Sequence, residues 1–213
     1  MNGTPEVVVR VSALAKRWDA ASGLEAVTFE LIRGEIVVVA GRSGSGKSTL
    51  LALLAGWTEP DSGVIERVGV WAADGAWARW DRTSIIPQVI APITELSMIE
   101  NVALPVRLGG VGWGEARTQA AAVLTLVDLD VLAERPVADA SLGQQQRLGV
   151  ARAVVVRPTL LLADEPSSHQ GPEHAALVLA ALRGVADAGG AVLIATHDEA
   201  VAAAADRVIA LNA

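Results

Sequence analysis

The chain has 213 residues, a formal net charge of −7 and no cysteine, and 52% of its residues are hydrophobic with a mean hydropathy of +0.41. The absence of cysteine excludes disulfides and cysteine-ligated metal sites, and the negative charge argues against a nucleic-acid partner. The sequence shows no apolar run of about 18 residues and no signal peptide, so we expect neither a membrane span nor secretion.

The spacing of apolar residues and the positions of Gly and Pro predict alternating strands and helices. In chain order we predict strands 6–11 and 26–32 joined by a turn at 20–23, strand 36–40, a helix from 47 that ends at Pro60–Gly63, strands 64–71 and 84–88, a helix from 95 that Gly109–Gly112 interrupts, helices 114–127 and 143–156, strand 160–163, helix 173–187, strand 191–195, helix 198–205 and strand 208–211. Residues 72–82, which include Trp77 and Trp80, have no assignable pattern.

This alternation predicts an α/β fold with a mainly parallel core sheet that is covered on both faces. The first strands are joined by short turns, which predicts a small antiparallel β subdomain near the N-terminus. We expect a single domain over residues 1–213, because the length suits one hydrophobic core. Within it we predict a catalytic core of 1–88 and 158–213 and an inserted helical subdomain of 89–157.

The stretch Gly41–Ser48 fits the phosphate-binding pattern G-x-x-x-x-G-K-[ST], with an apolar strand before it and a helix after it. Glycines allow backbone N–H groups to surround phosphate oxygens, and the N-terminus of the following helix favours an anion. Lys47 would reach the β- and γ-phosphates and the Ser48 hydroxyl would ligate Mg²⁺. The chain has only two lysines against fifteen arginines, and Lys47 is one of them.

Two adjacent carboxylates, Asp164 and Glu165, end the apolar strand that begins at Leu160. Ligand sites of open α/β sheets lie at the carboxyl ends of strands, and side chains alternate along a strand, so the two carboxylates can do different work. We expect Asp164 to hold Mg²⁺ and Glu165 to orient and deprotonate a water molecule. A solvated strand end before a Pro turn is the alternative.

Three further polar positions are candidates for the same site. His197 follows an apolar strand and could donate a hydrogen bond to a γ-phosphate, although a lone His is often structural. Gln88 ends a buried strand where it could contact metal-bound water. Ser141–Arg147 begins a helix with a capping arrangement, which could face a second phosphate. His169 and His174 lie in a polar loop and are expected to be exposed.

These elements, in this order, resemble the nucleotide-binding subunit of an ATP-binding-cassette (ABC) transporter, a P-loop NTPase, over essentially the whole chain. Gly41–Ser48 is similar to the family's Walker A loop, Leu160–Glu165 to its Walker B strand and Ser141–Arg147 to its signature motif. Gln88 and His197 match its Q-loop glutamine and switch histidine. The signature motif distinguishes this family from phosphate-loop kinases.

The resemblance implies that ATP and Mg²⁺ bind, with catalytic roles for Glu165, His197 and Gln88 and Mg²⁺ ligation by Ser48, Gln88 and Asp164. Trp18 lies where the family places an aromatic residue that stacks on adenine. In full, the resemblance implies nucleotide contacts from Trp18, Gly41, Arg42, Ser43, Gly44, Ser45, Gly46, Lys47, Ser48, Thr49, Ser141, Gly143 and Gln144.

The sequence departs from the family pattern at two positions. Leu142 replaces the first glycine of the signature, and Gly171 replaces an aspartate that normally crosses the dimer interface. The Leu142 side chain would crowd the partner's γ-phosphate unless it points away. The run Glu100–Pro105 is similar to that of a subgroup that serves lipoprotein release, macrolide and peptide export and a cell-division complex.

The resemblance implies two subunits, in a homo- or heterodimer, that sandwich ATP between Gly41–Ser48 of one chain and Ser141 and Gly143 of the other. It further implies that residues 89–93 receive a short helix of an integral membrane permease, so we expect a cytoplasmic protein peripheral to the inner face of the cell membrane. A regulatory, weakly catalytic half of a heterodimer is the alternative. A DNA-maintenance ATPase would need a long coiled-coil insertion, and a translation factor would need two cassettes. The sequence does not identify the cargo.

Overall fold

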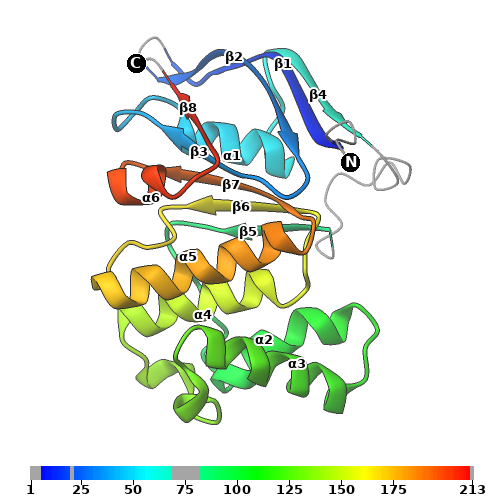
Figure 1. Cartoon of the computed structure of the whole chain (residues 1–213), viewed down its shortest axis with the longest axis vertical. Coiled ribbons are helices and arrows are strands. Elements are labelled where there is room, and N and C mark those ends of the chain that lie inside the picture. The colour runs from blue at the N-terminus through cyan, green and yellow to red at the C-terminus, as the bar shows by residue number, and fades with distance from the viewer. Residues whose placement is uncertain (1–5, 20–21, 69–81, 212–213) are drawn as a thin grey trace.

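The computed structural model describes residues 6–19, 22–68 and 82–211 as two sheets with helices on both sides of the larger one (Figure 1). The smaller sheet is antiparallel and has the strand order β2-β1-β4. Its strands are β1 (Val7–Arg17), β2 (Gly23–Ile32) and β4 (Ser62–Arg67). The antiparallel unit predicted for the N-terminal part of the chain is therefore confirmed.

The larger sheet is parallel in all four of its pairings and has the order β5-β6-β7-β3-β8. Its strands are β5 (Thr83–Ile86), β6 (Leu160–Asp164), β7 (Ala191–Thr196), β3 (Ile36–Ala40) and β8 (Arg207–Ala210). Alternate side chains enter different apolar clusters: Val37 and Val39 pack on one face and Val38 on the other. Burial on both faces explains why these strands are continuous apolar runs.

Helix α1 (Lys47–Ala55) lies between the two sheets, and the remaining helices cover the opposite face of the parallel sheet (Figure 1). In that layer α4 and α5 lie against the sheet, and α2 and α3 lie farther from it. Between β5 and β6 the described elements are helices only. The helices of this face are α2 (Met98–Leu108), α3 (Trp113–Leu126), η2 (Asp130–Leu132), η3 (Val137–Asp139), α4 (Leu142–Val154), α5 (Pro172–Asp187) and α6 (Glu199–Ala203).

Two predicted boundaries near α1 were wrong. The helix ends at Ala55 and not at Pro60–Gly63. It is capped by Gly56, whose left-handed backbone (φ 74°) lets its N–H bond the Ala52 and Leu53 carbonyls. Ser62 and Gly63 instead begin β4. A Cβ on Gly63 would lie 2.3 Å from the Ala13 carbonyl oxygen of β1, so this pairing requires glycine. The pattern of apolar residues does not reveal this close approach.

Other boundaries moved by a few residues. Strand β1 continues to Arg17 and β2 begins at Gly23, so both are longer than predicted, whereas α6 is shorter. The short helices η2 and η3 were not predicted. Residues 69–81, with Trp77 and Trp80, lie outside the described residues.

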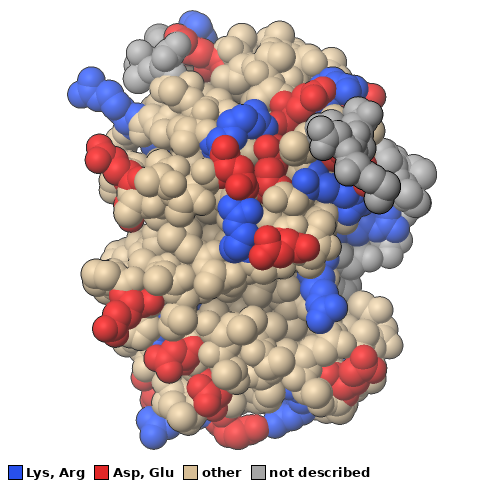
Figure 2. All heavy atoms as spheres, viewed as in Figure 1, with Lys and Arg blue, Asp and Glu red and all other residues tan. Residues whose placement is uncertain are grey.

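Acidic and basic side chains are interspersed on the face of the molecule in Figure 2. Ion pairs among the described residues include Arg10 with Glu30 and Glu66, and Arg207 with Glu35. Within the described ranges no helix has the length and apolar character needed to cross a membrane.

Candidate functional site

The carboxyl ends of four parallel strands meet at one edge of the larger sheet. Ala40 of β3 is paired with Thr196 of β7, and Asp164 of β6 with Ala195 of β7. Strand β5 joins the same edge through the pairing of Ile86 with Ala163. The segments that follow these strands carry the predicted polar residues, so the topology brings them together.

The loop between β3 and α1 requires glycine at several positions. Gly44 and Gly46 have φ angles of 84° and 93°, which side chains rarely adopt. A Cβ on Gly46 would lie 2.6 Å from the carbonyl oxygen of Gly23, and a Cβ on Gly41 would lie 2.4 Å from Ser45 Oγ. The backbone can therefore form a concave loop only with these residue types.

The N-terminus of α1 is suited to an anion. Gly46 caps the helix without a side-chain hydrogen bond, and the first turn contains no acidic residue. Lys47 Nζ donates to the carbonyl oxygens of Gly41 at 2.7 Å and Arg42 at 3.1 Å, which holds the ammonium over the loop. Backbone N–H groups, the helix dipole and a cation thus converge, as a phosphate group would require.

A cavity of about 540 Å³ lies in front of this loop. It contains nearly all the residues predicted to contact nucleotide from this chain's own side. Ser45 does not line it: its side chain is buried, and its Oγ has no hydrogen-bond partner in the described part of the chain. The described lining residues are Trp18, Ser22, Gly23, Gly41, Arg42, Ser43, Gly44, Gly46, Lys47, Ser48, Thr49, Gln88, Asp164, Glu165 and His197.

Two oxygen groups that could bind a metal ion lie next to each other in this cavity. Ser48 Oγ donates a hydrogen bond of 2.7 Å to Asp164 Oδ2. A hydroxyl and a carboxylate are the hard oxygen ligands that Mg²⁺ prefers. The predicted metal residues Ser48 and Asp164 therefore fit the group, and Gln88 lines the same cavity.

Glu165 is held in place by the last residue of β7 and the residue that follows it. Thr196 Oγ1 donates to Glu165 Oε2 at 2.7 Å, and the backbone N–H of His197 donates to Oε1 at 3.2 Å. His197 Nδ1 lies 2.6 Å from the same Oε1. Glu165 also has a left-handed backbone (φ 48°), an uncommon conformation for a residue with a side chain. Such strain at a strand end is frequent at functional sites.

Trp18 also lines the cavity and is 55% exposed, so its ring has an accessible surface. Its Nε1 donates to Thr49 Oγ1 at 3.0 Å, which links the ring to the start of α1. Lys16 Nζ lies 5.2 Å from the ring centroid and pairs with Asp61 at 2.8 Å. The hydrogen bond from Lys16, more than the other contacts, lowers the pKa of Asp61. The ring is thus fixed on two sides.

The predicted signature residues Ser141, Gly143 and Gln144 are not among the described residues that line this cavity. Ser141 caps α4, since its Oγ accepts from the Gln144 N–H at 3.2 Å while Gln144 Oε1 accepts from the Ser141 N–H at 2.9 Å. Leu142 is 70% exposed, so its side chain is directed to solvent in the single chain. The signature residues form a helix terminus that is separate from this cavity.

Sequence analysis missed three residues of this site. Ser22 and Gly23 line the cavity, and Gly23 lies against Gly46 through a contact between distant segments. Thr196, only 1% exposed, holds Glu165. Its position directly before His197 was the available signal, but a threonine at a strand end is too common to be selected by pattern.

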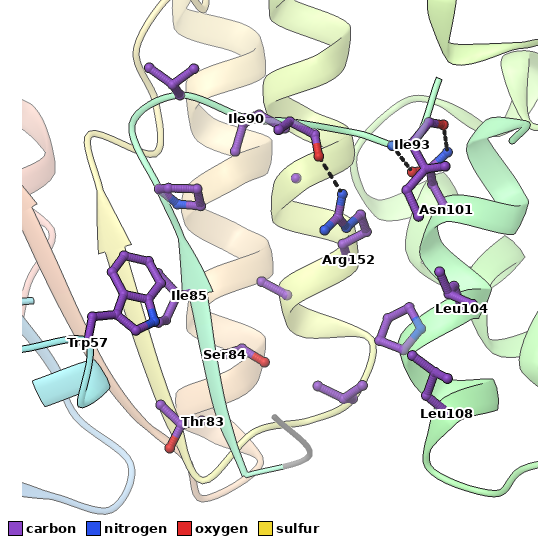
Figure 3. A pocket seen from close by; sticks show the side chains of 17 residues that line it. Trp57, Thr83, Ser84, Ile85, Ile90, Ile93, Asn101, Leu104, Leu108 and Arg152 are labelled. Atoms are coloured by element: carbon purple, nitrogen blue, oxygen red, sulfur yellow. Dashed lines mark hydrogen bonds between the residues drawn. The ribbon is translucent and has the colours of Figure 1, made fainter. Parts of the chain in front are cut away.

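A second cavity of about 550 Å³, here called the apolar groove, lies between the helices and β5 (Figure 3). Leu104 and Leu108 border it from α2, and the side chain of Trp57 reaches it from the segment after α1 (Figure 3). Trp57, Val89 and Leu108 are all more than half exposed, at 65%, 81% and 66%. Among the described residues that line the groove, Arg152 alone is charged, and its burial lowers its pKa.

The segment 89–93, which lines this groove, is fixed at three points. Asn101 accepts from the Ile93 N–H and donates to the Ile93 carbonyl, both at 2.9 Å (Figure 3). Arg152 Nη1 donates to the Ala91 carbonyl at 3.3 Å. Ile90 packs so closely on α4 that a Cβ on Gly149 would lie 2.5 Å from Ile90 Cδ1. The groove is therefore a preformed apolar surface.

Comparison with known proteins identifies relatives over most of the chain. The chain is 36% identical over 197 residues to an uncharacterised ABC transporter ATP-binding protein of Mycobacterium tuberculosis strain H37Rv, which covers 90% of this chain and 60% of that protein. It is 35% identical over 212 residues to a methionine import ATP-binding protein of Mesorhizobium japonicum, which covers 97% of this chain and 58% of that protein. The chain thus spans about three fifths of the length of these curated relatives.

Solved structures agree with this relationship. The dimeric ATP-binding cassette MJ0796, bound to ADP and phosphate after hydrolysis, has a TM-score of 0.85 and 28% identity, covering 96% of this chain and 94% of that one. A putative metal-chelate type ABC transporter has a TM-score of 0.79 and 27% identity, covering 97% of this chain and 80% of that one. The family described as ABC transporter matches residues 24–168. The loop, the paired carboxylates, the exposed signature helix and these relatives together place the chain in the ABC transporter family, as an ATP-binding domain.

Proposed function

We propose that this chain hydrolyses ATP and that hydrolysis powers a separately encoded membrane permease. The observation that carries the proposal is the shared cavity of the phosphate-binding loop, Asp164, Glu165, His197 and Gln88. A cation, a water-activating carboxylate and hydrogen-bond donors around one cavity are what phosphoryl transfer to water needs.

Each residue has a distinct role in this proposal. Lys47 and the N-terminus of α1 bind the phosphates, and Ser48 and Asp164 hold Mg²⁺, which supplies charge stabilisation to phosphate oxygens. Glu165 accepts the proton of the attacking water, because its carboxylate is held in a fixed orientation by Thr196. Trp18 offers its exposed face to adenine.

Gln88 connects the cavity to the apolar groove. Gln88 lines the nucleotide cavity, whereas its neighbours Pro87 and Val89 line the groove. A movement of Gln88 caused by binding or loss of nucleotide would therefore act directly on Pro87 and Val89 in the wall of the groove. We infer that the groove receives a short helix of the permease, with 1–88 and 158–213 acting as the catalytic core and 89–157 as the helical subdomain. The protein would then be cytoplasmic and peripheral to the inner face of the membrane.

A second nucleotide-binding subunit would complete the site. Ser141 and Gly143 lie outside this chain's cavity, so they are free to contact ATP held by another subunit. A Cβ at Gly171 would meet nothing within 4 Å among the described residues, and Leu142 is exposed. Neither position therefore decides between a homodimer and a heterodimer. In the heterodimer, a regulatory half that completes its partner's site poorly is the second candidate function, and the observation that motivates it is Gly171 in place of an aspartate.

The lipoprotein-release and macrolide-export subgroup rests on the short run Glu100–Pro105. Glu100 accepts from the Ser97 N–H at 2.9 Å, Asn101 fixes Ile93, and Leu104 and Pro105 line the apolar groove. The run thus shapes the surface offered to a permease, which supports a link to permease type. A relative named for methionine import is 35% identical to this chain, so the export direction stands on this run alone. Transport assays with the cognate permease in vesicles would test it.

The test of the proposed function is the variant Glu165→Gln, measured for mass in solution with and without Mg-ATP. Blocked hydrolysis should trap an ATP-bound dimer, and Glu173→Gln, on the exposed first turn of α5, should hydrolyse ATP like the wild type. A variant that binds ATP but stays monomeric would favour the regulatory half of a heterodimer. A variant and wild type that bind no ATP would refute the proposal.

A further inference from the structure

Lys16 lies beside the Trp18 ring but outside the nucleotide cavity. Its Nζ lies 5.2 Å from the centroid of the indole, within the range in which a cation is attracted to the face of an aromatic ring. Trp18 lines the nucleotide cavity, whereas Lys16 is not among the described residues that line it. The ammonium therefore approaches the ring from outside the cavity and leaves the surface inside it open to a ligand.

The ammonium of Lys16 is held in this position by Asp61. Lys16 Nζ donates to Asp61 Oδ1 at 2.8 Å, and only 16% of the Lys16 side chain is exposed. An exposed lysine side chain moves among many conformations, so burial of its methylene groups and an ion pair at its end both reduce that freedom. The position of the cation relative to the ring is therefore set by the fold.

Asp61 also fixes the backbone that carries Trp18. Its Oδ2 accepts from the Arg17 N–H at 2.8 Å, and its own N–H donates to the Ala15 carbonyl at 2.9 Å. Together with the ion pair to Lys16, these bonds join Asp61 to three consecutive residues of β1, directly before Trp18. One acidic residue from a distant part of the chain thus holds both the cation and the start of the segment with the ring.

The edge of the ring is fixed from a different element. Trp18 Nε1 donates to Thr49 Oγ1 in the first turn of α1, and the Trp18 N–H donates to the Ser22 carbonyl, both at 3.0 Å. With Lys16 against its face and Thr49 at its edge, the ring is held in one orientation and is still 55% exposed. A ring that is already oriented loses less entropy when a planar base stacks on it.

We propose that Lys16 is a positioning residue for base recognition: held by Asp61, it orients the Trp18 ring and draws electron density toward the face outside the cavity. The face inside the cavity then repels the π electrons of a base less, because a cation on one side reduces the negative potential on the other. This inference rests on the proposed ATPase function, in which Trp18 offers its exposed face to adenine. It predicts that Lys16 contributes to affinity only when the ligand carries a base.

The test replaces Lys16 by methionine, which keeps a long unbranched side chain and removes the charge. Calorimetry without Mg²⁺, so that ATP is not hydrolysed, measures the binding of ATP and of inorganic tripolyphosphate, which has the phosphates but no base. We expect the Kd for ATP to rise about three- to tenfold and the Kd for tripolyphosphate to stay unchanged. With Mg²⁺ and saturating ATP, kcat should not change, because Lys16 does not line the cavity that contains Glu165.

Two further variants separate the charge of Lys16 from its place in the fold. Lys16→Arg keeps a cation that can pair with Asp61 and lie on the ring, so it should restore most of the affinity for ATP. Asp61→Asn keeps an acceptor for the Arg17 N–H but loses the ion pair, so it should weaken ATP binding in the same way. It carries the test if the methionine variant does not fold.

The matched control is Arg10→Met. Arg10 also lies on β1 and forms ion pairs with Glu30 and Glu66, but it is not among the described residues that line the cavity. The same loss of a paired cation from the same strand should therefore leave the Kd for ATP as in the wild type.

A double-mutant cycle with Trp18→Ala tests whether Lys16 acts through the ring. In the Trp18→Ala background, Lys16→Met should have no further effect on the Kd for ATP, because no ring remains to be oriented. Equal losses of affinity in the two backgrounds would overturn the role of Lys16 as a positioning residue.

The outcomes also separate this inference from the proposed function. A Lys16→Met variant that binds ATP as tightly as the wild type, or that loses affinity for ATP and tripolyphosphate alike, would overturn the role of Lys16 and leave the ATPase function intact. A wild type that binds neither ATP nor tripolyphosphate would refute the proposed function, and the role of Lys16 would fail with it.

Discussion

Replacing Thr196 by valine removes a buried hydroxyl while keeping the shape of the side chain. That hydroxyl donates to Glu165 Oε2 at 2.7 Å and accepts from the Asp198 N–H at 3.0 Å. Thr196 is 1% exposed and the Glu165 side chain 11%, so water has little access to replace the bond between them. We expect Thr196→Val to destabilise the fold and to lower ATP hydrolysis.

The magnitude follows from the two lost contacts. A hydrogen bond to a charged group contributes about 1.5–3 kcal/mol and a neutral one about 1 kcal/mol. Asp198 is exposed and its N–H can bind water, so most of the loss comes from the Glu165 carboxylate. The expected decrease in the free energy of unfolding is about 2–4 kcal/mol. Thr196→Ser keeps the hydroxyl and should cost only about 1 kcal/mol for the lost methyl group.

Urea unfolding of the wild type and both variants measures this difference directly. Hydrolysis adds a functional readout: the valine variant should lose kcat with little change in ATP affinity, because Thr196 orients Glu165 and does not line the nucleotide cavity. Equal stability and equal kcat for the valine and serine variants would refute the assignment of Thr196 as the residue that holds Glu165.

Three further predictions test other contacts. Gly149→Ala should lower the free energy of unfolding by about 1–3 kcal/mol through a clash with Ile90, although alanine normally stabilises a helix, and Ile90→Ala should restore part of the loss in urea unfolding. Asp206 accepts from the Ile36 N–H at 2.7 Å, the main reason that its pKa lies below the ordinary 3.8. Its stabilisation is present above that ordinary value and is lost as the pH falls through the lower folded-state pKa. Asp206→Asn should therefore be less stable than wild type at about pH 7, and urea unfolding should show this difference shrink as the pH falls below 3.8. Gly171→Asp should fit without a clash and gain a few tenths of a kcal/mol as the cap of α5, and mass measurement should show stronger ATP-dependent dimerisation; a weaker dimer would contradict the interface role of this position.

Local patterns account for the main elements of the fold. The apolar runs 36–40, 160–163 and 191–195 predicted the central strands, because strands buried on both faces must be apolar throughout. Boundaries were less accurate where a distant segment decides them: β4 begins at Ser62 because Gly63 can approach Ala13 closely. Residues 60–63 by themselves carry no sign that they lie next to Ala13.

Residue types and spacing predicted which polar residues gather around the cavity in front of the glycine loop. The glycines around Lys47, the carboxylates at the end of β6 and the histidine after β7 each follow an apolar strand, and parallel strands present their carboxyl ends at one edge. The strand order β6-β7-β3 then makes these segments neighbours. Residues that position other site residues, such as Thr196 and Gly23, were not predicted, because their contacts join distant parts of the chain.

The tertiary structure alone decided which side chains act together across the chain. The amide of Gln170 bonds Gly143 and Arg147, more than 20 residues earlier, and Gln88 and Val89 face different cavities although they are adjacent. Residue type and local spacing determine which chemistry a segment can offer, since propensities and loop conformations act over a few residues. The packing of strands and helices determines which segments meet, because it depends on burial over the whole chain.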